Sequence, residues 1–143
     1  MKFAPRLAVL VAVAALLTGC SSSPLSPTSG PTAATAPAAG SSLAAADFAA
    51  AAKMPNTVLV DVRTPEEYAS GHLAGATLID VEAADFATKV AALDPTKTYA
   101  VYCRSANRSK VAMTVMQRAG IAGVFDLAGG ITSWKSAGGE VVS

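Results

Sequence analysis

The chain has 143 residues, 11 Lys and Arg against 10 Asp and Glu, and a formal net charge of +1. This length is typical of one compact domain plus tails, and so small a charge gives no indication of nucleic acid as a partner. Two Cys and one His cannot form a four-ligand zinc site unless carboxylates complete it, and an apolar content of 52% excludes disorder over the whole chain.

The N-terminus has the features of a targeting segment. Two cations precede an uninterrupted apolar run of eleven residues, Leu7 to Leu17. This run is too short to span a bilayer, which needs about 20 residues, but it suits a signal peptide. Residues 17–20, Leu-Thr-Gly-Cys, resemble the bacterial lipobox, whose cysteine is acylated after cleavage. We expect a lipoprotein signal peptide at 1–19 and lipidation of Cys20; the alternative is an ordinary signal peptide in which Cys20 is incidental.

Residues 20–42 are predicted to be the lipidated cysteine followed by a linker rich in Ser, Pro and Ala. From 21 to 42 the chain carries no charge, and Leu25 is its only sizeable apolar residue. Such a segment buries too little surface to offset its chain entropy, so we expect a flexible tether of roughly 25 Å. The predicted location is the cell envelope, with the lipid anchor on the outer face of the cytoplasmic membrane or in the periplasm.

The folded domain is expected at 43–143, where short apolar runs alternate with helical patterns. The runs predict strands at 57–62, 76–79, 98–103 and 124–127, with weaker edge-strand candidates at 42–43 and 141–142. Such alternation predicts an α/β fold, a mostly parallel central sheet of about five strands with helices on both faces.

Capping signals and apolar periodicity predict the helices between these strands. Thr64-Pro65-Glu66-Glu67 is typical of a helix start, with Thr64 as the N-cap. Apolar stripes predict a helix within 81–93 and another with positions 111, 115, 116 and 119 on one face, and a last helix begins near Ile131. Met113, Met116 and Trp134 are expected to be packing residues.

The chemistry is concentrated after the strand at 98–103. Cys103 ends this strand, and the chain then turns into a helix. Such a turn directs successive backbone N–H groups at one point, and Arg104 and Arg108 add positive charge, so we expect stabilisation of a thiolate and of an anionic substrate. On composition alone, a buried structural cysteine beside solvated arginines is an equal alternative.

Three stretches resemble signatures of the rhodanese-like sulfurtransferases. Residues 103–109, Cys-Arg-Ser-Ala-Asn-Arg-Ser, are similar to the active-site loop, commonly C-R-x-G-x-R-S. Residues 61–76 resemble D-V-R-x-x-x-E-Y-x-x-G-H-I-x-G-A, and residues 127–134 resemble L-x-G-G-x-x-x-W. One position departs from the pattern: Ala106 replaces the loop glycine, and a positive φ there would strain the loop by about 1 kcal/mol.

The resemblance implies a membrane-tethered sulfurtransferase of the thiosulfate sulfurtransferase type. The Cys103 thiolate would take sulfane sulfur from a small sulfur-containing anion such as thiosulfate and pass it, through a persulfide, to cyanide or to a thiol on a small molecule or protein. The residues expected to bind the substrate are Arg104, Ser105, Ala106, Asn107 and Arg108. No metal and no organic cofactor is implied.

Three further residues near the predicted site have structural interpretations. Asp61 and Arg63 end the first long strand, and we expect them to form an ion pair that positions the loop rather than to touch substrate. In this family His72 corresponds to a packing and hydrogen-bonding residue.

Two alternatives remain open at this stage. The first is a module without turnover that carries persulfide sulfur or binds a protein partner, which Ala106 and the lack of an obvious general base favour. The second is a phosphatase or arsenate reductase of the related fold. These enzymes use Cys-x5-Arg, whereas here four residues separate Cys103 from Arg108 and Ser109 occupies the position of their arginine.

Overall fold

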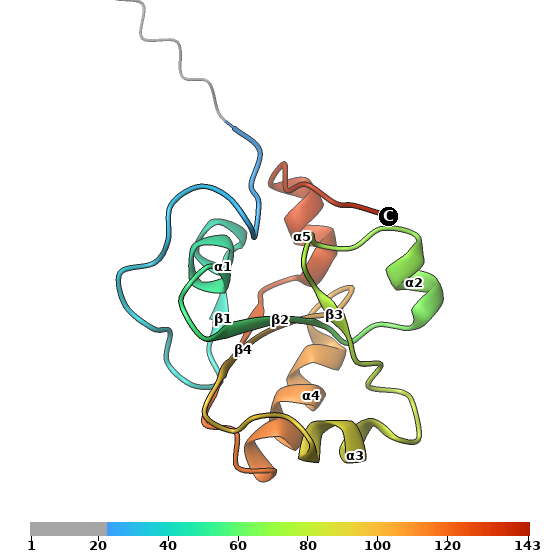
Figure 1. Cartoon of the computed structure of the whole chain (residues 1–143). Helices are drawn as coiled ribbons and strands as arrows, with labels where there is room; N and C mark the ends of the chain where they lie inside the picture. Colours follow the sequence, from blue (N-terminus) through green and yellow to red (C-terminus); the bar gives the residue numbers. More distant parts are fainter. Residues whose placement is uncertain (1–22) are drawn as a thin grey trace, which may run out of the picture.

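The computed structural model describes residues 23–143, which form three layers with a β-sheet in the middle (Figure 1). The strands are β1 Ser42–Leu43, β2 Thr57–Asp61, β3 Thr77–Leu78, β4 Thr98–Tyr102 and β5 Gly123–Leu127. They pair in parallel, in the order β1-β5-β4-β2-β3. The predicted fold class, a parallel sheet of five strands with helices on both faces, is confirmed.

The helices are α1 Ala45–Ala52, α2 Pro65–Ala69, α3 Phe86–Ala91, α4 Asn107–Arg118 and α5 Gly130–Ser136. Phe48 of α1 and Trp134 of α5 belong to the hydrophobic cluster on one face of the sheet, and Tyr68 of α2 packs against it. Phe86 of α3 and Met116 of α4 belong to the cluster on the other face. Figure 1 shows α1, α2 and α5 above the sheet and α3 and α4 below it.

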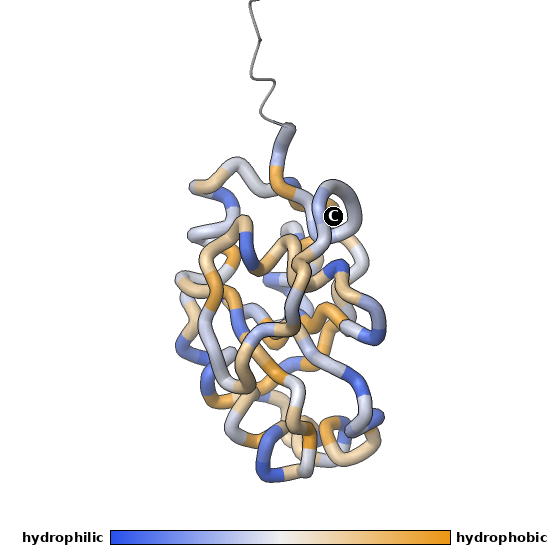
Figure 2. The backbone as a smooth tube through the Cα atoms, turned by 90° about the vertical axis from the view of Figure 1, so that its left-hand side faces the viewer, coloured by the Kyte–Doolittle hydropathy of each residue, from blue (hydrophilic) through white to orange (hydrophobic). Residues whose placement is uncertain are grey.

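Alternation along β4 assigns its side chains to the two clusters. Tyr99 and Val101 pack on the α3–α4 side, and Ala100 and Tyr102 pack on the α1–α5 side. Cys103, the next residue, again lies on the α3–α4 side. The strand therefore delivers the cysteine beside the start of α4. In Figure 2 hydrophobic stretches of the backbone run through the body of the domain, and the most hydrophilic ones lie at its periphery.

The structure confirms the predicted start of α2, but α4 buries a partly different face from the one predicted. In α2 the Thr64 hydroxyl accepts a hydrogen bond from Glu67 N–H, and the Glu67 carboxylate accepts one from Thr64 N–H, both at 3.3 Å. In α4, Val111 is 57% exposed although the apolar stripe predicted it to be buried. Met116 is buried as predicted, and the helix also buries Ser109, Ala112 and Met113. The small side chains at 109 and 112 lie on the buried face, which a pattern of large apolar residues does not reveal.

The segment 23–41 lies against the domain, whereas its composition predicts a free tether (Figure 1). Leu25 forms a β-bridge with Gly139, and its carbonyl accepts a hydrogen bond from Glu140 N–H at 2.9 Å. Further along, Ala33 N–H donates to the Ala50 carbonyl of α1, also at 2.9 Å. Backbone hydrogen bonds thus hold a segment that has few apolar side chains to bury, and composition does not report such bonds.

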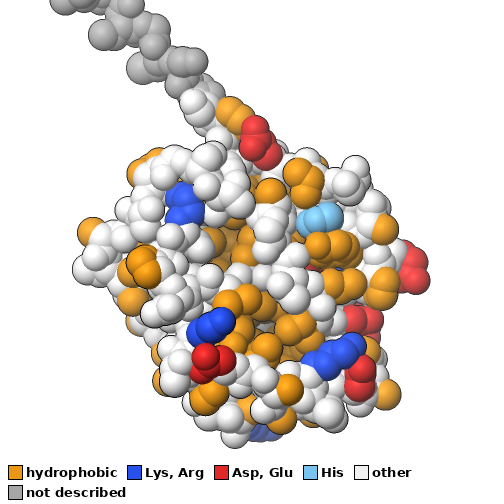
Figure 3. All heavy atoms as spheres, viewed as in Figure 1, with side chains coloured by type: hydrophobic (Ala, Val, Ile, Leu, Met, Phe, Trp, Pro, Cys, Tyr) orange, Lys and Arg blue, Asp and Glu red, His pale blue; other side chains and the backbone are white. Residues whose placement is uncertain are grey.

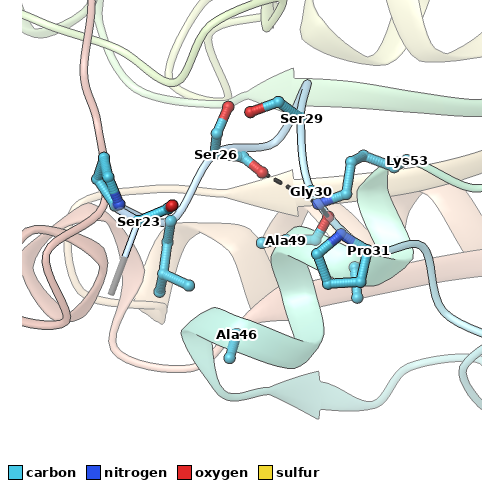
Figure 4. Close-up of a pocket in the computed structure, with 11 residues that line it drawn as sticks. Ser23, Ser26, Ser29, Gly30, Pro31, Ala46, Ala49 and Lys53 are labelled. Atoms are coloured by element: carbon cyan, nitrogen blue, oxygen red, sulfur yellow. Dashed lines mark hydrogen bonds between the residues drawn. The ribbon is translucent and has the colours of Figure 1, made fainter. Parts of the chain in front are cut away.

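A cavity of about 310 Å³ remains between this segment and α1 (Figure 4). Leu25, Pro31 and Ala49 line it together with Lys53, whose Nζ donates to the Ser26 carbonyl at 3.0 Å. Burial lowers the pKa of Lys53 below its ordinary value. None of the lining residues belongs to the loop at 103–109, so the cavity is separate from the predicted site.

The predicted signal peptide and the lipidation site Cys20 lie outside the described residues. Within residues 23–143 no helix combines the length and the apolarity needed to cross a bilayer. The lipid anchor stays a prediction.

Candidate active site

Cys103 lies at the carboxyl end of β4 as a free thiol, with 1% of its surface exposed. The start of α5 holds the backbone on which it sits. Ile131 N–H donates to the Cys103 carbonyl at 2.9 Å, and Thr132 donates to the Arg104 carbonyl through its N–H at 3.2 Å and its hydroxyl at 3.0 Å. The loop that follows the cysteine is therefore fixed to the C-terminal helix.

Gly130 makes this close approach possible. A Cβ at this position would lie 2.4 Å from the Cys103 carbonyl oxygen and 2.5 Å from the Arg104 carbonyl carbon. Its φ of +61° also falls in the left-handed region that favours glycine. The second glycine of the Gly129–Gly130 signature is thus required by the backbone of the cysteine loop.

Ala106 is the N-cap of α4 and has a φ of 73° and a ψ of −5°. The conditional prediction made for this position is met, because the loop does require a left-handed residue there. Alanine pays about 1 kcal/mol or more in this conformation, because its Cβ approaches the following carbonyl oxygen. The turn leads directly into α4, whose first amides have no carbonyl partner within the helix and can bind an anion.

The Arg108 guanidinium is bound by two carboxylates. Its guanidinium donates two hydrogen bonds of 2.7 Å to the Glu67 carboxylate of α2 and one of 2.9 Å to Glu82. These hydrogen bonds lower the pKa of the accepting Glu67 carboxylate to about 2 and raise the pKa of the donating Arg108 guanidinium. Arg108, predicted to bind substrate, therefore joins α4 to α2. On the face shown in Figure 3, Lys and Arg side chains lie apart from one another, some beside acidic side chains.

The other predicted loop residues differ in exposure. Arg104 and Ser105 are exposed, Asn107 is exposed at the first position of α4, and Ala106 is buried. Since Arg108 is paired with carboxylates, Arg104 is the arginine of this loop that is directed to solvent.

Asp61 and Arg63 form the predicted ion pair, with 2.6 Å between Oδ2 and Nη2 and almost no exposure of either side chain. Arg63 Nη2 also donates to the Gly71 carbonyl at 2.9 Å, and the guanidinium lies 5.7 Å from the ring centre of Tyr102. Burial raises the pKa of the Tyr102 phenol, whose oxygen accepts a hydrogen bond from Leu73 N–H. The pair therefore contacts the residue that precedes Cys103, and its role in positioning the loop stays a prediction.

His72 has the packing role expected for it. Its ring stacks on Tyr68 with 3.7 Å between ring centres, and Nδ1 lies 3.0 Å from the Tyr68 carbonyl oxygen. Its backbone pairs with Val142.

Two residues of the site were missed by the sequence analysis, Ser109 as a functional residue and Asp126 altogether. Cys103 Sγ lies 3.8 Å from Ser109 Oγ, and Ser109 Oγ donates to Asp126 Oδ2 at 2.7 Å. Both residues are fully buried. The available signal was an isolated acid inside the apolar strand Val124 to Leu127, since a buried carboxylate needs a partner.

Comparisons with known proteins agree with this architecture. The family model of the rhodanese-like domain matches residues 44–137. The thiosulfate sulfurtransferase GlpE of Pseudomonas entomophila is 35% identical over 89 residues, which cover 62% of this chain and 79% of that protein. An uncharacterized protein of Synechocystis is 34% identical over 88 residues, 57% of this chain, but the match spans only 44% of that relative.

The fold has solved counterparts. The crystal structure of a rhodanese-related protein from Thermoplasma volcanium has a TM-score of 0.63 and 33% sequence identity, covering 71% of this chain and 97% of that one. The cysteine loop, the glycine that lets α5 approach it and the match across the domain lead to one conclusion: the chain belongs to the rhodanese-like domain family.

Proposed function

We propose that the protein is a membrane-tethered sulfurtransferase that carries sulfane sulfur on Cys103. The observation that supports this most is the position of a free thiol at the carboxyl end of β4, directly before the left-handed turn into α4. A named relative, GlpE, is a thiosulfate sulfurtransferase, which favours thiosulfate or a similar anion as the donor.

The transfer proceeds in two displacements. The Cys103 thiolate attacks the outer sulfur of thiosulfate, a new S–S bond forms, and the bond to the sulfonyl sulfur breaks with its electron pair leaving on sulfite. The thiolate of an acceptor, or cyanide, then attacks the outer sulfur of the persulfide and releases Cys103 as a thiolate. The first amides of α4 are suited to the negative charge of the persulfide.

Arg104 is the cation that attracts the anionic donor. Its side chain is exposed beside Cys103, whereas two carboxylates already neutralise Arg108. The same pairing argues against a phosphatase, because an arginine bound to Glu67 and Glu82 is not available to bind a phosphoryl group.

The direct test is the intact mass of the purified protein after incubation with thiosulfate. We expect the wild type to gain the mass of one sulfur atom on Cys103 and Cys103→Ser to gain none while keeping its circular dichroism. Reduction with dithiothreitol should remove the added mass. A wild type that gains no sulfur, or a Ser variant that gains as much, contradicts the proposal.

Tethering is tested through Cys20. We expect the wild type to partition into detergent with an acyl mass on Cys20 and the Cys20→Ala variant to be unprocessed or untethered. Recovery of the wild type in the aqueous phase without an acyl group contradicts this part of the proposal.

A second candidate function, a persulfide carrier without turnover, is favoured by the 1% exposure of Cys103. A carrier forms the persulfide once but releases sulfur to cyanide slowly. If thiocyanate is released in the steady state at a rate close to that of persulfide formation, the protein is a sulfurtransferase and not a carrier.

A further inference from the structure

Asp126 is a buried carboxylate for which the sulfur transfer described above has no use. It lies in β5 between Phe125 and Leu127, and all three are buried. Within residues 23–143 its carboxylate forms no ion pair with a Lys, Arg or His. Two hydroxyls bind its side chain: Ser109 Oγ donates to Oδ2 at 2.7 Å, and Ser42 Oγ donates to Oδ1. A buried carboxylate without a cation is unfavourable in its ionised form.

Beyond the Ser109 hydroxyl, the next exchangeable proton is that of the Cys103 thiol, the nucleophile. Cys103 Sγ is 3.8 Å from Ser109 Oγ, within reach for the thiol to donate to the hydroxyl. The Ser109 hydroxyl has two acceptors within reach, the Ala106 carbonyl oxygen at 3.0 Å and Asp126 Oδ2 at 2.7 Å, and the shorter contact continues the path from Cys103 to Asp126. The path ends at Ser42, which is exposed on the edge strand β1. The path joins a thiol that must ionise to a carboxylate that lacks a counter-ion.

Two negative charges in this interior would repel each other. A thiolate on Cys103 and a carboxylate on Asp126 would be separated by one hydroxyl group only, with little water to screen them, since all three residues are at most 1% exposed. One proton held between the two groups, so that only one of them is charged at a time, removes this repulsion.

We propose that Asp126 holds the proton that Cys103 gives up when it becomes a nucleophile. The S–H proton of Cys103 passes to Ser109 Oγ while the Ser109 O–H proton passes to Asp126 Oδ2. One S–H bond breaks and one O–H bond forms on the carboxylate, Ser109 remains a hydroxyl, and the single negative charge moves from Asp126 to the sulfur. Where the inference concerns sulfur transfer it rests on the proposed function: the proton returns when the acceptor has taken the sulfur. Ser109 thus relays the proton and Asp126 holds it, and Asp126 acts on the sulfur only through Ser109.

The other acidic side chains around the site are already paired with cations and are therefore poor acceptors for the Cys103 proton. At the end of β2, Asp61 is neutralised by Arg63. From α2 and the chain before α3, Glu67 and Glu82 are bound to Arg108. The remaining cations near this end of α4, Arg104 and Lys110, are exposed. The strand neighbours in register with Asp126 are uncharged, Ser42 on β1 and Val101 on β4.

The test is the rate at which iodoacetamide alkylates Cys103 in the full chain between about pH 6 and pH 8. Because the shared proton does not leave the site, we expect a wild-type rate that varies less than about two-fold over this range. In Asp126→Asn the thiol must lose its proton to solvent, so the rate should be lower at pH 6 and rise up to about ten-fold per pH unit. The exposed Asp47→Asn serves as the matched control and should keep the wild-type profile.

Three outcomes overturn the proposal. They are an Asp126→Asn profile parallel to that of the wild type, a faster reaction of this variant at every pH, which would mark Asp126 as a fixed repelling charge, and a wild-type rate that itself rises about ten-fold per pH unit. If Asp126→Asn does not fold, Ser109→Ala should give the steep profile and Ser109→Thr, which keeps the hydroxyl, the flat one. Equal profiles for these two variants overturn the proposal as well. Alkylation needs no sulfur donor, so a failure here is distinguishable from a failure of the persulfide test.

Discussion

The sheet carries two fully buried carboxylates, and they differ in what surrounds them. Asp61, at the end of β2, is bound to Arg63 in an ion pair that also fixes Gly71. Asp126, in β5, has hydroxyls as its side-chain partners, and only the Ser109 side chain lies between its carboxylate and the sulfur of Cys103. The Asp61 carboxylate is paired with a cation, which favours its ionised form, whereas the Asp126 carboxylate has no cation and can accept a proton. We therefore expect changes at the end of β2 to affect stability first, and changes around Cys103 to affect chemistry first.

The largest effect is expected from Arg63→Ala, which leaves Asp61 buried without a cation. The free energy of unfolding in urea should fall by about 3 to 5 kcal/mol. The double variant Asp61→Asn/Arg63→Met, which removes both charges, should recover a large part of this loss. A slower formation of the persulfide per folded molecule of the double variant would show that the pair also positions the cysteine loop, so that Asp61 would affect the chemistry as well as the stability.

The next effect in size is expected from Gly130→Ala. The new Cβ must displace the carbonyl groups of Cys103 and Arg104. The left-handed φ of this position costs an alanine about 1 to 2 kcal/mol in addition. Gly138→Ala is the matched control, because its φ is +78° and nothing lies within 4 Å of the added Cβ. Only Gly130→Ala should slow alkylation and persulfide formation at Cys103. Equal rates for the two variants would show that the approach of α5 does not matter for the site.

A smaller effect depends on pH and concerns the bridge from α2 to α4. Glu67 has a pKa of about 2 in the folded protein, below its value of about 4.3 in an unfolded chain. Its contribution is therefore complete above about pH 4.3 and is lost as the pH falls toward 2. Because the bridge is partly exposed, we expect Glu67→Gln to cost about 1 kcal/mol at pH 7 and about half of that at pH 3. Urea titrations of both proteins at the two pH values measure this, and an equal cost at both would contradict it.

The smallest effect is expected from Ala106→Gly. Glycine removes the strain of a left-handed alanine, but it also loses more chain entropy on folding. The net effect should be a stabilisation of about 0.5 to 1 kcal/mol. Asn56→Gly is the comparison, because Asn56 has a φ of 62° but tolerates this region better. Thermal unfolding of both variants measures the difference. A destabilised Ala106→Gly would mean that the methyl group packs more favourably than its backbone strain costs.

The sequence was informative where a few neighbouring residues determine a structure. The capping box of Thr64 and Glu67 and the left-handed backbone of Ala106 are local and appear as predicted. The strand that leads to Cys103 is local as well, and it ends one residue earlier than predicted, at Tyr102. The partners of Arg108 and Ser109 are not local, since Glu67 is 41 positions from Arg108 and Asp126 is 17 positions from Ser109. Such pairs depend on how α4 packs on the sheet, and the misjudged face of that helix concealed them.

The β-bridge between Leu25 and Gly139 holds the N-terminal end of the described chain beside the C-terminal end of α5. Gly139 follows the last turn of α5, and the first turn of the same helix holds the carbonyl groups of Cys103 and Arg104. The seven residues of this helix span about 10 Å. An acyl chain on Cys20 would thus bring the far end of α5 to the bilayer and leave the sulfur loop at the other end of the helix. α5 would then serve as a spacer, and an acceptor could reach the persulfide from the aqueous side without crossing the lipid headgroups.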